Sequence, residues 1–359
     1  MENLFQNKVI HGNVLDVIKT IPDNTADMII TSPPYWGLRD YNLPDTVFGN
    51  NYDCDHIWQE ENHFLHRGSS VSKKLTAGVM NNEQASSNIC SKCGAWKGQL
   101  GQEPDPRMYI DNLLEIFNEC KRVVKDSGSV WVNLGDSYSA NRSYQVDGTK
   151  QCQTSQPKVK QPQCKNYGIK PKSLIGIPDR FKIAMIDNGW ICRNEIIWHK
   201  PNQMPSSAQD RFTVDFEKLY FFTKNEKYYF EQQLEESEWA KLDKRAETGA
   251  TLGKKGSQGI YAQNESGKYR KDKMRNMRCV WSINTKPLKE AHFAVYPEQL
   301  IEVPIISCCP ENGLVLDIFF GSGTTGVVAK KLKRNYLGID LNLSYIEDIA
   351  IKRIEKATT

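Results

Sequence analysis

Short apolar runs and helical patterns alternate along most of this chain. The apolar runs predict strands at residues 8–12, 26–31, 129–134, 191–198, 216–223, 314–320 and 334–340. Elsewhere apolar residues recur with the spacing of an amphipathic helix, as in residues 14–21 and 109–124. Strands that alternate with helices are typical of a parallel sheet covered on both faces. The pattern therefore predicts one α/β domain with a mostly parallel, seven-stranded sheet.

Three polar stretches interrupt this pattern. Residues 37–106 and 236–290 are predicted to be insertions, since both are polar and show little periodicity. Residues 141–172 are rich in Gln, Lys, Ser and Asn and predict a mobile loop. The second insertion is basic and has interleaved tyrosines, which fits either a solvated face or a nucleic-acid contact.

A glycine loop near the end of the chain carries the first candidate site. The run 314–320 breaks into Gly321-Ser-Gly-Thr-Thr-Gly326, a helical pattern follows, and the next strand ends at Asp340. Strand, glycine loop and helix in this order are typical of a nucleotide site, with the later carboxylate placed to bind ribose hydroxyls. Asp317, just before the glycines, suits an amine or sulfonium better than phosphates. A glycine-rich turn without a ligand is the alternative.

The second candidate site is Ser32-Pro-Pro-Tyr35, which follows the strand at 26–31. Two successive prolines remove two N–H donors, so the turn presents Ser32 Oγ and backbone carbonyls as acceptors. With Tyr35 beside them, these acceptors would suit a flat ring that carries an exocyclic amino group. A proline turn that only caps the strand is the alternative.

Together the two motifs resemble those of the DNA amino-methyltransferases that use S-adenosylmethionine. Residues 32–35 match the family pattern (Ser/Asn/Asp)-Pro-Pro-(Tyr/Phe), and residues 317–325 match Asp-Pro-Phe-x-Gly-Ser-Gly-Thr-Thr, with Ile318 in place of the proline. The amine motif precedes the cofactor motif, as in the circularly permuted β group of that family. The resemblance covers most of the chain and implies a Rossmann-like methyltransferase fold. It makes 1–36 with 107–235 the catalytic half and 291–359 the cofactor-binding half.

The resemblance also implies roles for individual residues. Ser32, Pro33, Pro34 and Tyr35 would form the catalytic turn. Asn13 stands where relatives commonly have Asp, and its carbonyl could still accept from the adenine amino group of the cofactor. Phe293 would pack on the methionine part of the cofactor. The remaining implied cofactor contacts are Thr31, Asp317, Phe319, Gly321, Ser322, Gly323, Thr324, Thr325 and Asp340.

The activity implied is methyl transfer to the exocyclic amine of a base flipped out of double-stranded DNA. The family tends to pair Ser-Pro-Pro-Tyr with cytosine N4, which favours that base, and adenine N6 stays open. The basic insertion would contact DNA, as would Lys200 at the end of a strand. The implied contacts in the insertion are Lys268, Arg270, Lys271, Lys273 and Arg275. A non-catalytic DNA-binding module and an RNA or protein methyltransferase are the rival interpretations.

Bulk properties limit the setting. The net charge of +4 does not by itself indicate a nucleic-acid partner, and no apolar run is long enough to span a membrane. The ten cysteines show no evident disulfide framework, so we expect a reducing, cytoplasmic environment. Whether a cognate restriction endonuclease exists, and the oligomeric state, stay open.

Four residues of the first insertion form a candidate zinc site. Cys54-x-His56 and Cys90-x-x-Cys93 supply four ligands, which suffice for a tetrahedral zinc ion. A zinc ion would help to hold together a segment with little apolar content. His63 and His66 are alternative fourth ligands, and reduced surface thiols are the alternative to a metal site.

Overall fold

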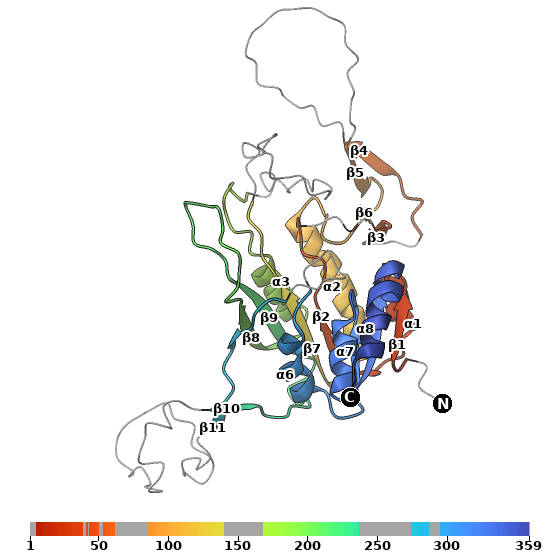
Figure 1. The fold of residues 1–359 in the computed structure, drawn as a ribbon. Coiled ribbons are helices and arrows are strands. Elements are labelled where there is room, and N and C mark those ends of the chain that lie inside the picture. Colours follow the sequence, from red (N-terminus) through yellow and green to blue (C-terminus); the bar gives the residue numbers. More distant parts are fainter. Residues whose placement is uncertain are drawn as a thin grey trace, which may run out of the picture.

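A mixed β-sheet with helices on both faces forms the body of the protein (Figure 1). The computed structural model describes residues 5–38, 41, 43–49, 53–61, 85–139, 168–236, 274–286 and 295–358. The sheet order is β1-β14-β13-β2-β7-β9-β8-β12. In that order the strands are Lys8–His11, Asn335–Asp340, Leu314–Asp317, Ala26–Thr31, Val124–Leu134, Phe216–Thr223, Ile191–His199 and Val280–Ser282.

All neighbours in this sheet pair in parallel except β9, which runs antiparallel to both β7 and β8. The predicted α/β fold with a mostly parallel sheet is confirmed. The sheet has eight strands rather than the seven expected, because β12 adds to the edge next to β8. With three residues, β12 is too short to give a pattern in the sequence, and it lies inside the segment 236–290 that was expected to be an insertion.

Each face of the sheet packs on its own set of helices. Helices α1 (Val14–Thr20), α2 (Pro106–Val123) and α3 (Ile177–Asp187) contribute to one hydrophobic core. Helices α6 (Glu298–Cys308) and α7 (Thr324–Lys331) contribute to a second. Side chains alternate between the two cores along a strand, so that all the apolar side chains of β2, β7 and β13 are buried. A π-helical segment, η3 (Tyr345–Ala350), continues into α8 (Ile351–Lys356).

Two smaller sheets lie outside the main one. The first has the order β3-β6-β5-β4 and is antiparallel; its strands are Thr46–Phe48, Trp96–Gly98, Ala85–Cys90 and Trp58–Glu61. Figure 1 shows it at the top of the molecule, beyond the end of α2. The second joins β10 (Leu234–Glu236) to β11 (Met274–Asn276). Within the described ranges, no helix has the length and apolar character needed to cross a bilayer.

Candidate active site

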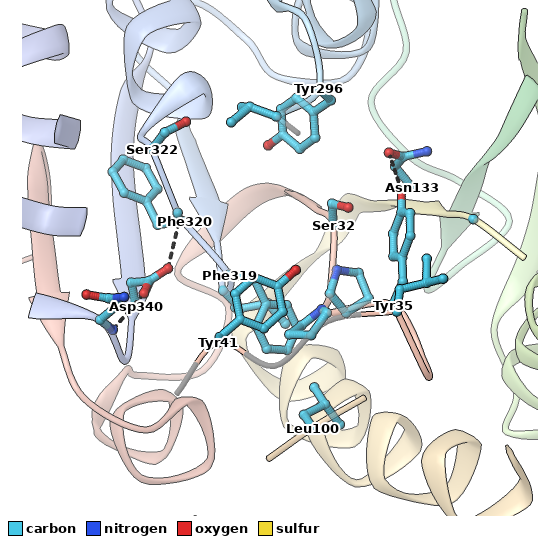
Figure 2. Close-up of a pocket in the computed structure, with 18 of the residues that line it drawn as sticks. Ser32, Tyr35, Tyr41, Leu100, Asn133, Tyr296, Phe319, Phe320, Ser322 and Asp340 are labelled. Atoms are coloured by element: carbon cyan, nitrogen blue, oxygen red, sulfur yellow. Dashed lines mark hydrogen bonds between the residues drawn. The ribbon is translucent and has the colours of Figure 1, made fainter. Parts of the chain in front are cut away.

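The two sequence motifs meet in one cavity of about 830 Å³. Ser32 follows β2, Ile318 follows β13 and Asp340 ends β14, and all three line it. Because these strands are parallel neighbours, their carboxyl ends bring distant parts of the chain to one edge of the sheet. Figure 2 shows Asp340 and Phe320 on one side of the cavity, the Tyr35–Asn133 pair on the other, and Ser32 between them.

The glycine loop needs its glycines for both conformation and space. Gly321 and Gly323 have φ angles of +49° and +77°, which side chains disfavour. A Cβ on Gly323 would also lie 2.8 Å from Cβ of Ala350. Arg353 donates to the Ser322 carbonyl (2.7 Å) and to Ser322 Oγ (2.9 Å), which fixes the loop against α8.

Asp317 lies beneath this loop rather than in the cavity wall. It is 1% exposed and accepts hydrogen bonds from Thr31 Oγ1 (2.6 Å), Thr325 Oγ1 (2.5 Å), Tyr296 Oη (3.0 Å) and the Phe319 N–H (3.1 Å). Burial raises the pKa of this carboxyl. Because four donors surround it, Asp317 organises the loop and has no cavity-lining position, contrary to the direct ligand contact expected from the sequence. Gly323, Thr31 and Thr325 likewise lie behind the wall, whereas Phe319, Gly321, Ser322 and Thr324 line it.

Asp340 does line the cavity. Its Oδ2 accepts from the Gly321 N–H (2.6 Å) and its Oδ1 from the Asn342 N–H (2.8 Å), so the carboxylate stands at the mouth of the glycine loop. Burial raises the pKa of Asp340. Asn13 lines the same region, where its Oδ1 accepts from the Leu15 N–H (2.9 Å) and caps α1. The second lone pair of that oxygen is the one that a ligand amine would use.

Tyr35 is held firmly at the other end of the cavity. Its hydroxyl lies 2.7 Å from Glu217 Oε2 and 2.9 Å from Asn133 Oδ1, both of which accept. Burial and the nearby Glu217 carboxylate raise the pKa of Tyr35, so the hydroxyl stays protonated. A Cβ on Gly135 would lie 2.7 Å from the tyrosine ring, so the ring packs directly on that glycine. Tyr109 Oη donates to the Pro34 carbonyl (2.8 Å) and holds the proline turn from behind.

Lys200 belongs to this end of the cavity and not to an exposed surface. Its ammonium forms an ion pair with Glu217 and lies 4.4 Å from the centre of the Trp198 ring. The side chains of Lys200 and Glu217 are only 12% and 17% exposed. Lys200 was expected to contact DNA or to serve a structural role. In this structure it is paired with Glu217 and forms part of the pocket wall, and its contact with DNA stays a prediction.

Several functional candidates were not named from the sequence. Glu217 and Tyr296 line the cavity, as do Leu100, Phe320 and Asn342. The signal for Tyr296 was present in the Tyr-Pro at 296–297, which precedes α6. Nothing in the local pattern distinguishes Glu217 from a surface acid.

The four predicted metal ligands come together. One potential ligand atom from each of Cys54, His56, Cys90 and Cys93 lies within 4.8 Å of the others. Cys54 Sγ is 3.9 Å from Cys90 Sγ, and Cys93 Sγ is 3.4 Å from His56 Nδ1. His63 and His66 lie outside the described residues.

Most of the expected DNA contacts fall outside the described residues, namely Lys268, Arg270, Lys271 and Lys273, as does Phe293. Arg275 is described and lies in β11, where its Nε donates to Glu235 at 2.8 Å. Arg278 donates to the same carboxylate oxygen at 2.6 Å. Glu235 therefore neutralises part of the basic charge of this segment.

Sequence comparison relates nearly the whole chain to known DNA methylases. Residues 26–352 match the DNA methylase family. The type II methyltransferase M.Cfr9I of Citrobacter freundii is 33% identical over 98% of this chain and 88% of its own length. M.SmaI of Serratia marcescens is 31% identical over 96% of this chain and 89% of its own length.

Solved structures share the fold at lower identity. The cytosine-N4-specific PvuII DNA methyltransferase superposes with a TM-score of 0.52 and 16% identity, covering 98% of this chain and 91% of that one. A putative DNA modification methylase from Thermus thermophilus, solved with S-adenosyl-L-methionine, gives a TM-score of 0.51 at 17% identity, covering 98% and 94%. The family match and these relatives agree with the joined amine and glycine motifs, and the chain belongs to the N6/N4 DNA methylase family.

Proposed function

We propose that this enzyme transfers a methyl group from S-adenosylmethionine to N4 of a cytosine flipped out of double-stranded DNA. The observation that carries the proposal is the shared cavity, where Ser32-Pro-Pro-Tyr35 faces the Asp340 side of the glycine loop. The choice of cytosine rests on the serine of the Ser-Pro-Pro-Tyr motif. A fold neighbour that carries the cytosine-N4 description agrees with it.

The glycine-loop side of the cavity has the chemistry of an adenosyl site. Asp340 is an acceptor-only carboxylate, which suits a ribose diol and disfavours a phosphate. Phe319, Phe320 and Tyr345 supply apolar walls for a planar base. When bound there, S-adenosylmethionine supplies an electrophilic methyl group on a sulfonium sulfur.

The proline-turn side would activate the amine. The lone pair of an exocyclic amino group is delocalised into its ring, so the nitrogen is a poor nucleophile. We expect Ser32 Oγ and the Pro33 carbonyl to accept its two N–H bonds, which lets the nitrogen pyramidalise and direct its lone pair at the methyl group. The nitrogen then loses one proton through these acceptors to solvent. Alignment of this kind contributes about 7–11 kcal/mol to lowering a barrier.

Tyr35 would hold the flipped base by stacking. Its hydroxyl is bound to Glu217 and Asn133, and its ring contacts Gly135, so the ring is already oriented before the base arrives. A fixed aromatic face lowers the cost of ordering the base.

A zinc ion at Cys54, His56, Cys90 and Cys93 is part of this proposal. Thiolates bind zinc at about 2.3 Å and imidazole at about 2.0–2.1 Å, which in a tetrahedron gives edges of about 3.8 Å for S–S and about 3.5–3.6 Å for S–N. The S–S distance of 3.9 Å and the S–N distance of 3.4 Å lie within about 0.2 Å of these edges. Three sulfurs and one imidazole nitrogen are a donor set that zinc prefers.

Two further parts of the proposal concern partners. The basic segment 236–290 would contact DNA and carry part of its recognition. Since the curated relatives are type II methyltransferases, a cognate restriction endonuclease is the expected partner, acting on the same DNA in the cytoplasm.

The test is a product analysis. The purified enzyme is incubated with mixed-sequence DNA and labelled S-adenosylmethionine, and the DNA is digested to nucleosides for mass spectrometry. We expect N4-methylcytosine. N6-methyladenine would keep the mechanism and overturn the choice of base, and unlabelled DNA despite cofactor binding would refute DNA methylation altogether.

A matched pair of variants tests the amine site. Ser32→Ala removes one proposed acceptor and should lower kcat while S-adenosylmethionine affinity is unchanged, since Ser32 belongs to the proline turn and not to the glycine loop or to Asp340. Ser127→Ala, at an exposed position of β7, should leave both unchanged. Full turnover by Ser32→Ala would show that the amine site is misassigned.

A further inference from the structure

The small sheet that carries the four metal ligands also builds one wall of the shared cavity. Thr46 and Phe48 of β3 line the cavity, as do Gln99 and Leu100, which follow β6 directly. Cys54-x-His56 comes shortly after β3, and Cys90-x-x-Cys93 forms the turn between β5 and β6. Both halves of the metal cluster are therefore covalently continuous with the pocket wall.

Strand pairing makes this wall a single unit. β3 pairs with β6 in the register Thr46 with Gly98 and Phe48 with Trp96. The Phe48 and Trp96 rings stack with centroids 5.9 Å apart, and both side chains are buried. A displacement of the Cys90–Cys93 turn would therefore move β6 and β3 together.

The wall contacts the catalytic turn directly. The Gly37 N–H donates to the Gly101 carbonyl at 2.8 Å. A Cβ on Gly101 would lie 3.2 Å from the Pro34 carbonyl and 3.1 Å from the Tyr35 carbonyl. The chain at Gly101 thus passes within van der Waals distance of the proline turn, and only glycine fits there at its φ of +92°.

The turns that carry the metal ligands have little core of their own. Among the described residues of 43–98, the buried apolar side chains are Phe48, Cys90, Ala95 and Trp96, and Phe48 and Trp96 pack into the main core. Hydrogen bonds to Asn13 and Glu115 hold the β3 end of the sheet, so a metal crosslink acts mainly on the Cys54–His56 and Cys90–Cys93 turns and on the strands that they join. Gly94, with a φ of +77° and open space around it, lets the Cys90–Cys93 turn fold back on the cluster.

We propose that zinc at Cys54, His56, Cys90 and Cys93 positions the Thr46–Phe48 and Gln99–Gly101 wall, so that the metal controls placement of the flipped base. This proposal rests on the proposed function of the cavity. The cofactor side depends mainly on the glycine loop, η3 and α8. The small sheet reaches it through Thr46 Oγ1, which accepts from Asn13 Nδ2 at 2.7 Å, but the Leu15 N–H of α1 holds Asn13 Oδ1 independently of that sheet. Loss of zinc should therefore impair methyl transfer to DNA and spare cofactor binding.

The experiment compares Cys93→Ser with Cys192→Ser in the full chain. Cys192 lies in β8, outside both the cluster and the basic segment 236–290, and is half-buried like Cys93, so its variant controls for the change from thiol to hydroxyl. We expect one zinc per chain in the wild type and Cys192→Ser by elemental analysis, and none in Cys93→Ser. The kcat/KM for DNA should fall about 100-fold in Cys93→Ser, the size of effect that a misplacement of about 1 Å causes. Calorimetry should give an S-adenosylmethionine Kd like that of the wild type.

Hydrogen exchange on the wild type gives a readout that does not depend on activity or on mutation. Chelation should speed exchange at the amides of 95–102, and added zinc should restore their protection, whereas the amides of α7 should not change. Absence of zinc from the pure protein, or unchanged exchange and turnover after its removal, would overturn the proposal. Zinc-dependent protection of 95–102 in a protein that methylates no DNA would uphold the metal-held wall and refute the proposed function instead.

Discussion

Glu103 allows a quantitative test of what stabilises the pocket wall at Gly101. Its side chain is 1% exposed, and its carboxylate accepts only from neutral donors, the Gly101 N–H (2.8 Å) and Asn112 Nδ2 (3.0 Å). Burial raises the pKa of this carboxyl to about 7, although both hydrogen bonds act in the opposite direction. The Gly101 N–H, next to the Ser-Pro-Pro-Tyr turn, is therefore bound by a carboxyl group that changes its charge near neutral pH.

The sign of the effect follows from proton linkage. Between its unfolded pKa of 4.5 and its folded pKa of about 7, Glu103 binds a proton in the folded state and releases it on unfolding. The free energy of unfolding therefore falls as the pH rises through this window, and the loss is complete above it. A raised pKa of this size corresponds to about 3 kcal/mol.

Glu103→Gln should remove this dependence. Glutamine keeps the acceptor for the Gly101 N–H, and Asn112 can rotate its amide to accept from the new NH₂ group. Urea unfolding is measured at several pH values between 4.5 and 8 for the wild type, Glu103→Gln and the exposed control Glu226→Gln. The stability advantage of Glu103→Gln over the wild type should grow by about 3 kcal/mol across this range. Parallel curves for wild type and Glu103→Gln would refute the reasoning, because Glu103 would then have the same pKa in the folded and unfolded states.

Three other substitutions give separate expectations. Tyr35→Phe removes a hydroxyl that donates to a carboxylate and should cost about 1.5–3 kcal/mol in urea unfolding, with the stacking ring and measurable methylation retained. Gly323→Ala should lower the free energy of unfolding in urea by about 2–4 kcal/mol, because the residue has a φ of +77° and its new Cβ would clash with Ala350. Gly176→Ala is the control: its φ is +78° but the space around it is open, so the loss should be smaller and due to backbone conformation alone. Asp340→Asn should weaken S-adenosylmethionine binding about tenfold or more by calorimetry, and unchanged affinity would exclude Asp340 from the cofactor site.

The elements that the sequence predicted well are those whose signal is local. A buried strand such as β2 or β14 is a continuous apolar run, and α2 shows its core face at helical spacing. The two motifs were equally visible, since proline and glycine restrict or free the backbone at their own positions. Parallel pairing then places Ser32 and the glycine loop at one edge, although they are far apart in the chain.

Burial of polar groups was harder to foresee. Asp317 is adjacent to the glycine loop in sequence, which suggested a ligand contact, yet Thr31, Tyr296 and Thr325 from separate elements surround it. A carboxylate with that many donors is satisfied within the protein. Only the tertiary arrangement distinguishes it from Asp340, which stands at an equivalent strand end and faces the cavity.

The case of Glu217 shows why strand direction matters for finding a site. In a parallel sheet, ligand-binding side chains follow the carboxyl ends of the strands, and the residues predicted from the sequence, Ser32 and Asp340, lie at such ends. Because β9 is antiparallel to its neighbours, its first residues lie at that same edge and its last residue, Thr223, lies at the opposite one. Glu217, the second residue of β9, therefore reaches Tyr35 from a position where the rule predicts nothing. A single antiparallel strand thus adds its amino-terminal residues to the active site, at the edge where the parallel strands contribute their carboxyl ends.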